Sequence, residues 1–439
     1  MSLLFSTIAR ATAMVLAPVV DPAPANETNP VATATPTGAQ ADDNVKSRLR
    51  ALENKNAELE NQIAALAGDV ESFELRDIIP RVGDGRFGLA PGASKVYSVE
   101  EGISIGGYGE FLFSFPSGQT DVFDALRAIT YIGYKFNENW VFNSEIEFEH
   151  GTTGTTSGTT DSGGSVSVEF AYIDYLHSDA LNARGGLLLV PIGLINELHE
   201  PTTFLPTARP VTETVIIPTT WRENGGGIFG NVGGFDYRLY VTNGLEGADF
   251  SASGFRGGRQ NGNRAAADDV ALSARVDYVE TPGLIVGGSI YQGESDQDQG
   301  GLPDLATTII EAHADWKHAG WNLRILAAHS SLSNAGAFNN ITGENVAEEM
   351  RGGYIEAGYD VMSLIDPESS SSLSPYIRWE SIDTQAVLPT GFSEAGGIDS
   401  EIITYGINYK PIDQVVIKAD YQDWNNGTDR FQIVLGYVF

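Results

Sequence analysis

The chain contains no cysteine in its 439 residues, which excludes a disulfide framework and a thiolate metal site. It also contains no run of 18 or more apolar residues, the length that a transmembrane helix requires. Basic residues are scarce: 26 Lys and Arg stand against 58 Asp and Glu, which gives a formal net charge of −32. This balance argues against nucleic acid as a partner and against attraction to an anionic membrane surface.

Glycine and aromatic residues are plentiful. The chain has 50 Gly, 17 Tyr and 6 Trp, a composition typical of many strands, tight turns and aromatic residues at a membrane interface. Without a spanning helix, the chain could cross a membrane only as a closed β-barrel, because barrel strands satisfy one another's backbone hydrogen bonds.

The first forty residues have the pattern of a secretory signal, although it is imperfect. Arg10 is its single basic residue, residues 11–20 form a short apolar region, and residues 23–25 (Ala, Pro, Ala) have the form of a cleavage site. A second candidate cleavage site ends at Ala41. We therefore expect a signal peptide at 1–25, with cleavage as late as 41 as the alternative, and a disordered linker at 26–42.

Residues 43–79 carry apolar positions at alternating spacings of three and four, the heptad pattern of a coiled coil. Ile and Val at the a positions with Leu at d favour two strands in peptides, whereas a three-fold barrel would favour three. A lone amphipathic helix packed on a barrel is the alternative. The predicted core of the coiled coil, which we expect in the periplasm, is Leu49, Leu52, Asn56, Leu59, Ile63, Leu66 and Val70.

From Ile103 onward the apolar period changes to two, which indicates a linker at 80–102 and a β-domain at 103–439. A barrel that holds water turns the apolar face outward, whereas a soluble sandwich turns it inward, and alternation alone does not separate the two. We predict sixteen strands, near 103–115, 121–136, 140–150, 166–178, 183–195, 219–230, 235–243, 270–280, 283–293, 307–317, 321–333, 349–362, 373–384, 400–410, 415–424 and 430–439.

The connections between these strands favour the membrane barrel. Those after even-numbered strands are mostly tight, as at 137–139, and those after odd-numbered strands are mostly long, as at 196–218 and 244–269. Short turns on one rim and long loops on the other are typical of outer-membrane barrels. The predicted fold is an all-β, 16-stranded antiparallel transmembrane β-barrel preceded by an N-terminal coiled-coil helix.

The last strand has an aromatic or aliphatic residue at every second position and ends on an aromatic residue. This pattern resembles the C-terminal signal by which Gram-negative outer-membrane barrels are recognised for assembly, so the barrel assembly machinery is an expected partner. An ordinary edge strand of a soluble protein is the alternative. The residues of the signal are Phe431, Ile433, Leu435, Tyr437 and Phe439.

Five strings resemble the phosphate-selective porin O and P family: residues 190–194 (VPIGL), 203–204 (TF), 221–225 (WRENG), 254–262 (GFRGGRQNG) and 274–278 (ARVDY). The resemblance covers residues 100–439, and an upstream coiled coil recurs in that family. It implies a homotrimeric outer-membrane porin whose third long loop, 196–218, folds inward and narrows the channel.

Charged residues of the channel do not follow an anion pore, because acids outnumber bases in the constriction loop and its flanks. We therefore expect weak selectivity of either sign. The candidate constriction residues are Glu197, His199, Glu200, Arg209, Glu213, Arg222 and Glu223. The candidate basic residues of the channel wall are Arg127, Arg238, Arg275, Arg324 and Arg378.

Passive diffusion of small ions and hydrophilic solutes, with phosphate or other anions among the candidates, is the predicted function. A tether in which the coiled coil links the outer membrane to the cell wall is the alternative. Six scattered histidines form no recognisable nucleophile motif, so we expect no catalytic residues, no cofactor and no metal. Outer-membrane lipid and lipopolysaccharide are expected partners, because divalent cations bridge acidic loops to a polyanionic surface.

Overall fold

The computed structural model describes residues 38–72, 85–153 and 163–439. The expected signal peptide, most of the first linker and the end of the expected coiled coil lie outside these residues. Two compact units divide the chain, residues 1–74 and 75–439. Among the described helices, none is long and apolar enough to cross a membrane.

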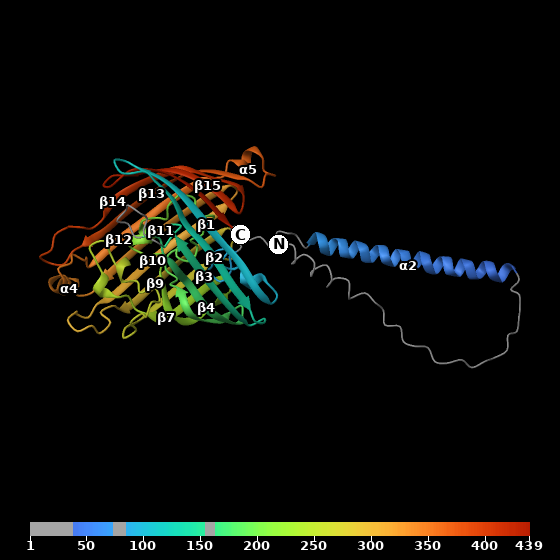
Figure 1. Cartoon of the computed structure of the whole chain (residues 1–439), viewed down its shortest axis with the longest axis horizontal. Coiled ribbons are helices and arrows are strands. Elements are labelled where there is room, and N and C mark those ends of the chain that lie inside the picture. Colours follow the sequence, from blue (N-terminus) through green and yellow to red (C-terminus); the bar gives the residue numbers. More distant parts are fainter. Residues whose placement is uncertain (1–37, 73–84, 154–162) are drawn as a thin grey trace. The chain divides into compact units, whose positions relative to one another are not determined.

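Helix α2, Gly38–Ser72, contains the heptad segment (Figure 1). Its side chains are described from residue 46 to residue 63, and Leu49, Leu52, Leu59 and Ile63 are 45–64% exposed. The helix by itself therefore leaves its apolar seam uncovered. The side chains of Leu66 and Val70 lie outside the described residues.

The described residues of the second unit form sixteen antiparallel strands that close into a barrel, as predicted. Each strand pairs with its neighbours in sequence, and β1 closes the barrel against β16. The strands are β1 Gly102–Pro116, β2 Val122–Lys135, β3 Trp140–Glu149, β4 Val166–Ser178, β5 Leu181–Leu189, β6 Arg222–Val232, β7 Phe235–Asn243, β8 Val270–Tyr278, β9 Leu284–Glu294, β10 Ala306–His318, β11 Trp321–Leu332, β12 Glu349–Tyr359, β13 Ser372–Val387, β14 Asp399–Ile412, β15 Val415–Trp424 and β16 Arg430–Val438.

The apolar face of the strands points outward. On β14, Ile403, Tyr405 and Ile407 are 41–50% exposed, whereas Thr404 and Asn408, which point to the other face, are buried. The barrel therefore has the inverse arrangement of a soluble sandwich, as the sequence pattern requires for a barrel in lipid.

The closing seam is continuous to the end of the chain. Tyr108 pairs with Val438 in the β1–β16 register, and Gly107 and Phe439 exchange two backbone hydrogen bonds of 2.8 and 3.0 Å. Strand β16 therefore leaves neither β1 nor itself with an open edge along this seam.

Connections on the two rims differ in length, as predicted. The long loops hold α3 Thr212–Val215, the 3₁₀ turns η3 Gly247–Asp249 and η4 Arg256–Gly258, and α4 Ala335–Thr342. The other rim has tight turns, apart from the segment that holds α5 Met362–Ile365. Figure 1 shows α4 and α5 at opposite ends of the barrel.

Candidate functional site inside the barrel

Among the segments of the chain that lie inside the barrel, two pack against much of its wall. One is the inward loop, residues 190–221 between β5 and β6, and the other is the entry segment, residues 85–98, which holds η2 Lys95–Ser98 and precedes β1. Both contain fully buried side chains, among them Ile192, Trp221, Leu89 and Val96. The resemblance to porins implied the inward loop, whereas the entry segment was expected to be a linker.

Polar groups of the strands hold the inward loop against the wall. The Arg324 guanidinium on β11 donates to the Thr203 carbonyl at 3.2 Å, and the Lys418 ammonium on β15 donates to the Pro206 carbonyl at 2.8 Å. Thr207 donates from its backbone nitrogen and its hydroxyl to the Asp420 carboxylate at 2.7 and 2.8 Å. The loop is therefore fixed by charge-assisted hydrogen bonds along much of its length.

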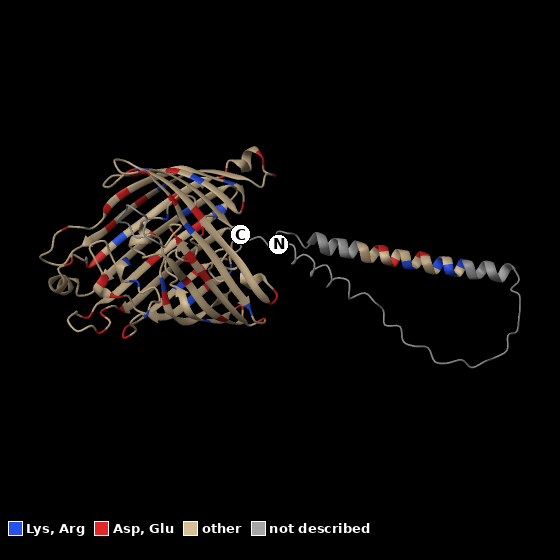
Figure 2. Ribbon diagram, in the orientation of Figure 1, with Lys and Arg blue, Asp and Glu red and all other residues tan. Residues whose placement is uncertain are grey.

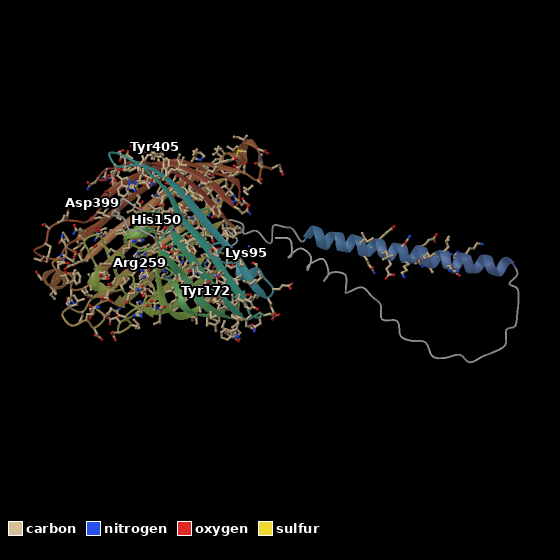
Figure 3. The ribbon with its side chains drawn as sticks, in the orientation of Figure 1. Lys95, His150, Tyr172, Arg259, Asp399 and Tyr405 are labelled. Carbon is tan, nitrogen blue, oxygen red and sulfur yellow. The ribbon has the colours of Figure 1, made fainter. Side chains whose placement is uncertain are left out.

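The entry segment is fixed on the facing strands. The Tyr97 hydroxyl donates to Asp174 on β4 at 2.7 Å, and Asp174 also accepts two hydrogen bonds from Arg184 on β5 at 2.8 and 3.0 Å. The Ala93 nitrogen donates to the Glu200 carboxylate at 3.0 Å, which joins the entry segment to the inward loop. Tyr172 belongs to the same cluster and is labelled in Figure 3.

The acidic side chains expected at the constriction are buried and contact other groups of the protein. Glu213 accepts from the Tyr354 hydroxyl and the Ile195 nitrogen, both at 2.6 Å, and Glu197 lies 3.4 Å from Arg238. Glu223 accepts from Asn243 at 2.6 Å. Burial raises the pKa of the Glu197, Glu200 and Glu213 carboxyl groups, although their partners oppose the shift.

The basic residues expected on the wall are all buried or nearly so, and each has an acidic partner. These pairs neutralise the charge of the wall arginines, and Figure 2 shows acidic residues in red and basic residues in blue on the strands of the barrel. The shortest contacts are Arg127 to Glu110 at 3.0 Å, Arg238 to Asp277 at 3.0 Å, Arg275 to Asp277 at 2.7 Å, Arg324 to Asp315 at 2.7 Å, and Arg378 to Glu356 at 3.7 Å.

A different group of arginines lies together without such neutralisation. Arg209 donates to the Thr220 hydroxyl at 2.9 Å, and Arg259 donates to the Thr220 carbonyl, so both guanidinium groups meet at one residue. Arg259 also donates to the Arg256 carbonyl at 3.0 Å, and Arg222 follows Thr220 by two residues. We call Arg209, Arg222, Arg256 and Arg259 the four-arginine cluster.

The charges of this cluster act on one another. Burial, followed by the positive charges of Arg259 and Arg209, lowers the pKa of Arg256 to about 9. Burial and the charge of Arg222 lower the pKa of Arg259 to about 10. Arg256 and Arg259 therefore keep their charge at neutral pH.

The cluster has few acidic partners. Among the described residues, Arg222 alone of the four has a carboxylate within 4.0 Å, that of Glu169 at 3.5 Å. Within the described residues, two nitrogen atoms of the cluster, Arg209 Nη2 and Arg222 Nε, are buried without a hydrogen-bond partner. The cluster is half-buried, and Arg259 is labelled in Figure 3. It therefore offers concentrated positive charge and free donors in the barrel interior.

Sequence reasoning found two members of this cluster, Arg209 and Arg222, and missed Arg256 and Arg259. Both missed residues lie in the string 254–262, which carried the family resemblance. They lie beside the inward loop because of the conformation of the loop 244–269. The sequence pattern within that loop does not predict this conformation.

One histidine of the inward loop meets two glutamates of the wall. His199 Nε2 lies 3.2 Å from Glu145 on β3 and 3.3 Å from Glu169 on β4. Burial lowers the pKa of His199, but the two carboxylates outweigh it and raise the pKa to about 10. These three residues are the group in the described chain whose ligand atoms could converge on one metal ion.

Comparison with known proteins places the chain in a family. A protein of Aquifex aeolicus (strain VF5), described as an uncharacterized protein, is 37% identical over 374 residues, which are 81% of this chain and 84% of that protein. The chain belongs to the same family as this Aquifex protein. No family model matches the chain, so the resemblance to phosphate-selective porins has no support from that source.

Solved structures show the same fold at low sequence identity. OmpTdeltaL8, a loop deletion mutant of an outer membrane protein of Vibrio cholerae, has a TM-score of 0.50 at 10% identity and covers 78% of this chain and 100% of its own. OmpF of Salmonella typhi, in complex with daunomycin, has a TM-score of 0.50 at 15% identity and covers 77% of this chain and 98% of its own. The fold is therefore that of outer-membrane porins.

Proposed function

We propose that the protein is an outer-membrane channel for passive diffusion of small solutes. The porin fold supports this assignment, and so does the outward apolar face, which suits lipid rather than water. The inward loop and the entry segment are held against the wall inside the barrel, so each chain should conduct less than a barrel with an open lumen.

We further propose that the channel prefers anions, and the four-arginine cluster carries this proposal. A ring or cluster of arginines attracts anions where their charge is not neutralised by acids. The charge count of the inward loop and its flanks suggested weak selectivity of either sign. That count gives equal weight to acids and bases. The acids are buried against hydrogen-bond or ion-pair partners, whereas in the described residues three of the four arginines have no carboxylate within 4.0 Å. The preference for phosphate over other anions, which the family resemblance implies, remains part of the proposal.

The reversal potential of the folded protein in a planar bilayer under a KCl gradient tests the preference. Wild type should pass chloride more readily than potassium, and the double variant R256Q/R259Q should move the reversal potential toward that of potassium. R351Q is the matched control, because Arg351 is exposed and pairs with Glu349 outside the interior. A cation-selective wild type, or a double variant with the selectivity of wild type, would contradict the proposal.

The helix suggests a second function, an envelope tether that binds the cell wall. The observation behind it is the seam of α2, whose apolar side chains the helix by itself leaves uncovered. Two further copies in a homotrimer would cover the seam, and the barrel assembly machinery and lipopolysaccharide are the proposed partners of the barrel. Deleting residues 42–79 separates the functions: a tether loses envelope attachment while channel current persists.

A further inference from the structure

The buried contact between His199, Glu145 and Glu169 has the composition of a metal site. The three residues come from the inward loop and two neighbouring strands, and their side chains are at most 3% exposed. One imidazole nitrogen and two carboxylate oxygens form a ligand set that Zn²⁺ accepts in proteins. One ligand atom from each residue lies within 4.8 Å of the other two.

The hydrogen bond on the far side of the imidazole sets its orientation. His199 Nδ1 lies 2.8 Å from the Asn196 carbonyl oxygen, which only accepts, so Nδ1 carries a proton. In the neutral ring, the lone pair is then on Nε2, which faces the two glutamates. A backbone carbonyl on one ring nitrogen is the usual outer contact of a histidine that binds metal through the other.

The spacing of the three atoms fits ligands better than it fits an ion pair. Charge-assisted hydrogen bonds between nitrogen and carboxylate oxygen are about 2.7–2.9 Å long. The distances from His199 Nε2 to Glu145 and Glu169 are 3.2 and 3.3 Å. Two ligands bound at about 2.0–2.2 Å to a tetrahedral ion lie about 3.3–3.5 Å apart, close to these values.

Unpartnered oxygen atoms at the same place are a second, independent observation. Within the described chain, the Oε2 atom of Glu145 is buried without a hydrogen-bond partner, and so is the hydroxyl of Tyr108. The Tyr108 ring centroid lies 6.1 Å from that of His199. Buried carboxylate oxygens without donors are costly unless a cation neutralises them.

We propose that Glu145, Glu169 and His199 bind a divalent cation of the zinc class, which fixes the inward loop to strands β3 and β4. Arg222 contacts the other oxygen of Glu169, Oε1, so Oε2 faces His199. The ion is structural: it joins three elements of the barrel interior beside the four-arginine cluster. This site does not depend on the proposed channel function.

Zinc binding by the full chain tests the site. Protein folded in detergent is stripped with EDTA, and Zn²⁺ is supplied both during refolding and afterwards, because the site is buried. Calorimetry and elemental analysis should give one tightly bound Zn²⁺ per chain, and X-ray absorption should show one imidazole nitrogen and two carboxylate oxygens at about 2.0–2.2 Å. H199Q should weaken binding at least about 100-fold, since it removes a ligand itself rather than a residue that orients one.

His313 supplies the matched control. It is also buried between two carboxylates, but Asp277 contacts Nε2 and Glu311 contacts Nδ1, so the two acids do not meet at one nitrogen. H313Q should therefore keep the zinc. Circular dichroism checks the fold of each variant, and E169Q replaces H199Q if the latter does not fold. A wild type without bound zinc, or folded H199Q or E169Q with wild-type affinity, would overturn the proposal.

Discussion

At the scale of single residues, pairing decides what a charge contributes. Arg238 and Arg275 share the Asp277 carboxylate, so neither presents a free charge. Arg256 donates to a backbone carbonyl, that of Thr214 at 3.1 Å, and this contact leaves its charge intact. The same residue type is therefore a structural cross-link in one place and, in the proposed channel, a source of attraction for anions in the other.

Replacing Arg222 by Gln should shift the permeability ratio toward cations. A unit charge about 7 Å from a passing ion contributes about 0.6 kcal/mol in water, which is about threefold in the ratio. The reversal potential in a salt gradient measures this change, with R351Q as the control. Block of the chloride current by micromolar phosphate would show instead that the cluster binds phosphate tightly.

Replacing Arg184 by Gln should destabilise the barrel by about 3–5 kcal/mol, because Asp174 would remain buried without its partner. Both side chains are at most 3% exposed and lie 2.8 Å apart. Denaturant unfolding in detergent micelles measures the change. R351Q, which breaks an exposed pair, should cost less than about 1 kcal/mol. Equal losses for the two variants would mean that burial does not govern these pairs.

At the scale of elements, the entry segment packs inside the barrel although it precedes the first strand in the sequence. Residues 85–98 precede the first strand, yet Val96 and Tyr97 are buried inside the barrel. Phe87 packs edge-on against Phe229 of β6 at 5.2 Å between ring centroids. The segment fills interior space that would otherwise be open to water.

Releasing the entry segment should raise single-channel conductance. The double variant F87A/Y97A removes the two aromatic side chains that hold it, and exposure of residues 85–98 to protease reports its release. K95A is the control, because Lys95 is largely outside this packing and donates to the Ile105 carbonyl near the surface. Protease-sensitive protein with unchanged conductance would show that the segment does not restrict the path.

Helix α2 should associate in parallel with copies from other chains. The full chain is expected to cross-link to three copies, matching the barrel, whereas the isolated peptide 42–79 should dimerise because of its residues at a and d. L52D places a charge on the seam and should abolish peptide association, whereas R50D lies off the seam and should not. Cross-linking of the full chain that stops at two copies would contradict the trimer.

At the scale of the whole molecule, closure of the barrel unites distant parts of the chain. Strand β16 completes the hydrogen bonding of β1 through nine register pairs, from Tyr108 with Val438 to Pro116 with Arg430. A barrel with a missing closing strand would expose two edges to lipid, where unpaired backbone groups cost several kcal/mol each. The last strand is therefore required for the fold as a whole.

Deleting Phe439 should reduce the yield of inserted barrel. The deletion removes two backbone hydrogen bonds to Gly107 and the terminal aromatic residue of the expected assembly signal. Heat-modifiable mobility of the membrane fraction measures insertion. F136A, which alters an outward aromatic residue that is 52% exposed and lies away from the seam, is the control. Insertion of the deletion variant at wild-type yield would show that the signal was misread.

The sequence by itself determined the helix, the sixteen strands and the outward face, because each depends on local periodicity. Strand ends were less certain: β5 ends at Leu189 rather than 195, since residues 190–195 already belong to the inward loop. Only the tertiary structure decided which charges are paired and which are free. Arg259 reaches Thr220, and His199 reaches Glu145, across 39 and 54 positions. Such contacts depend on how the loops fold inside the closed barrel. The alternation of side chains along the strands does not predict the conformation of these loops.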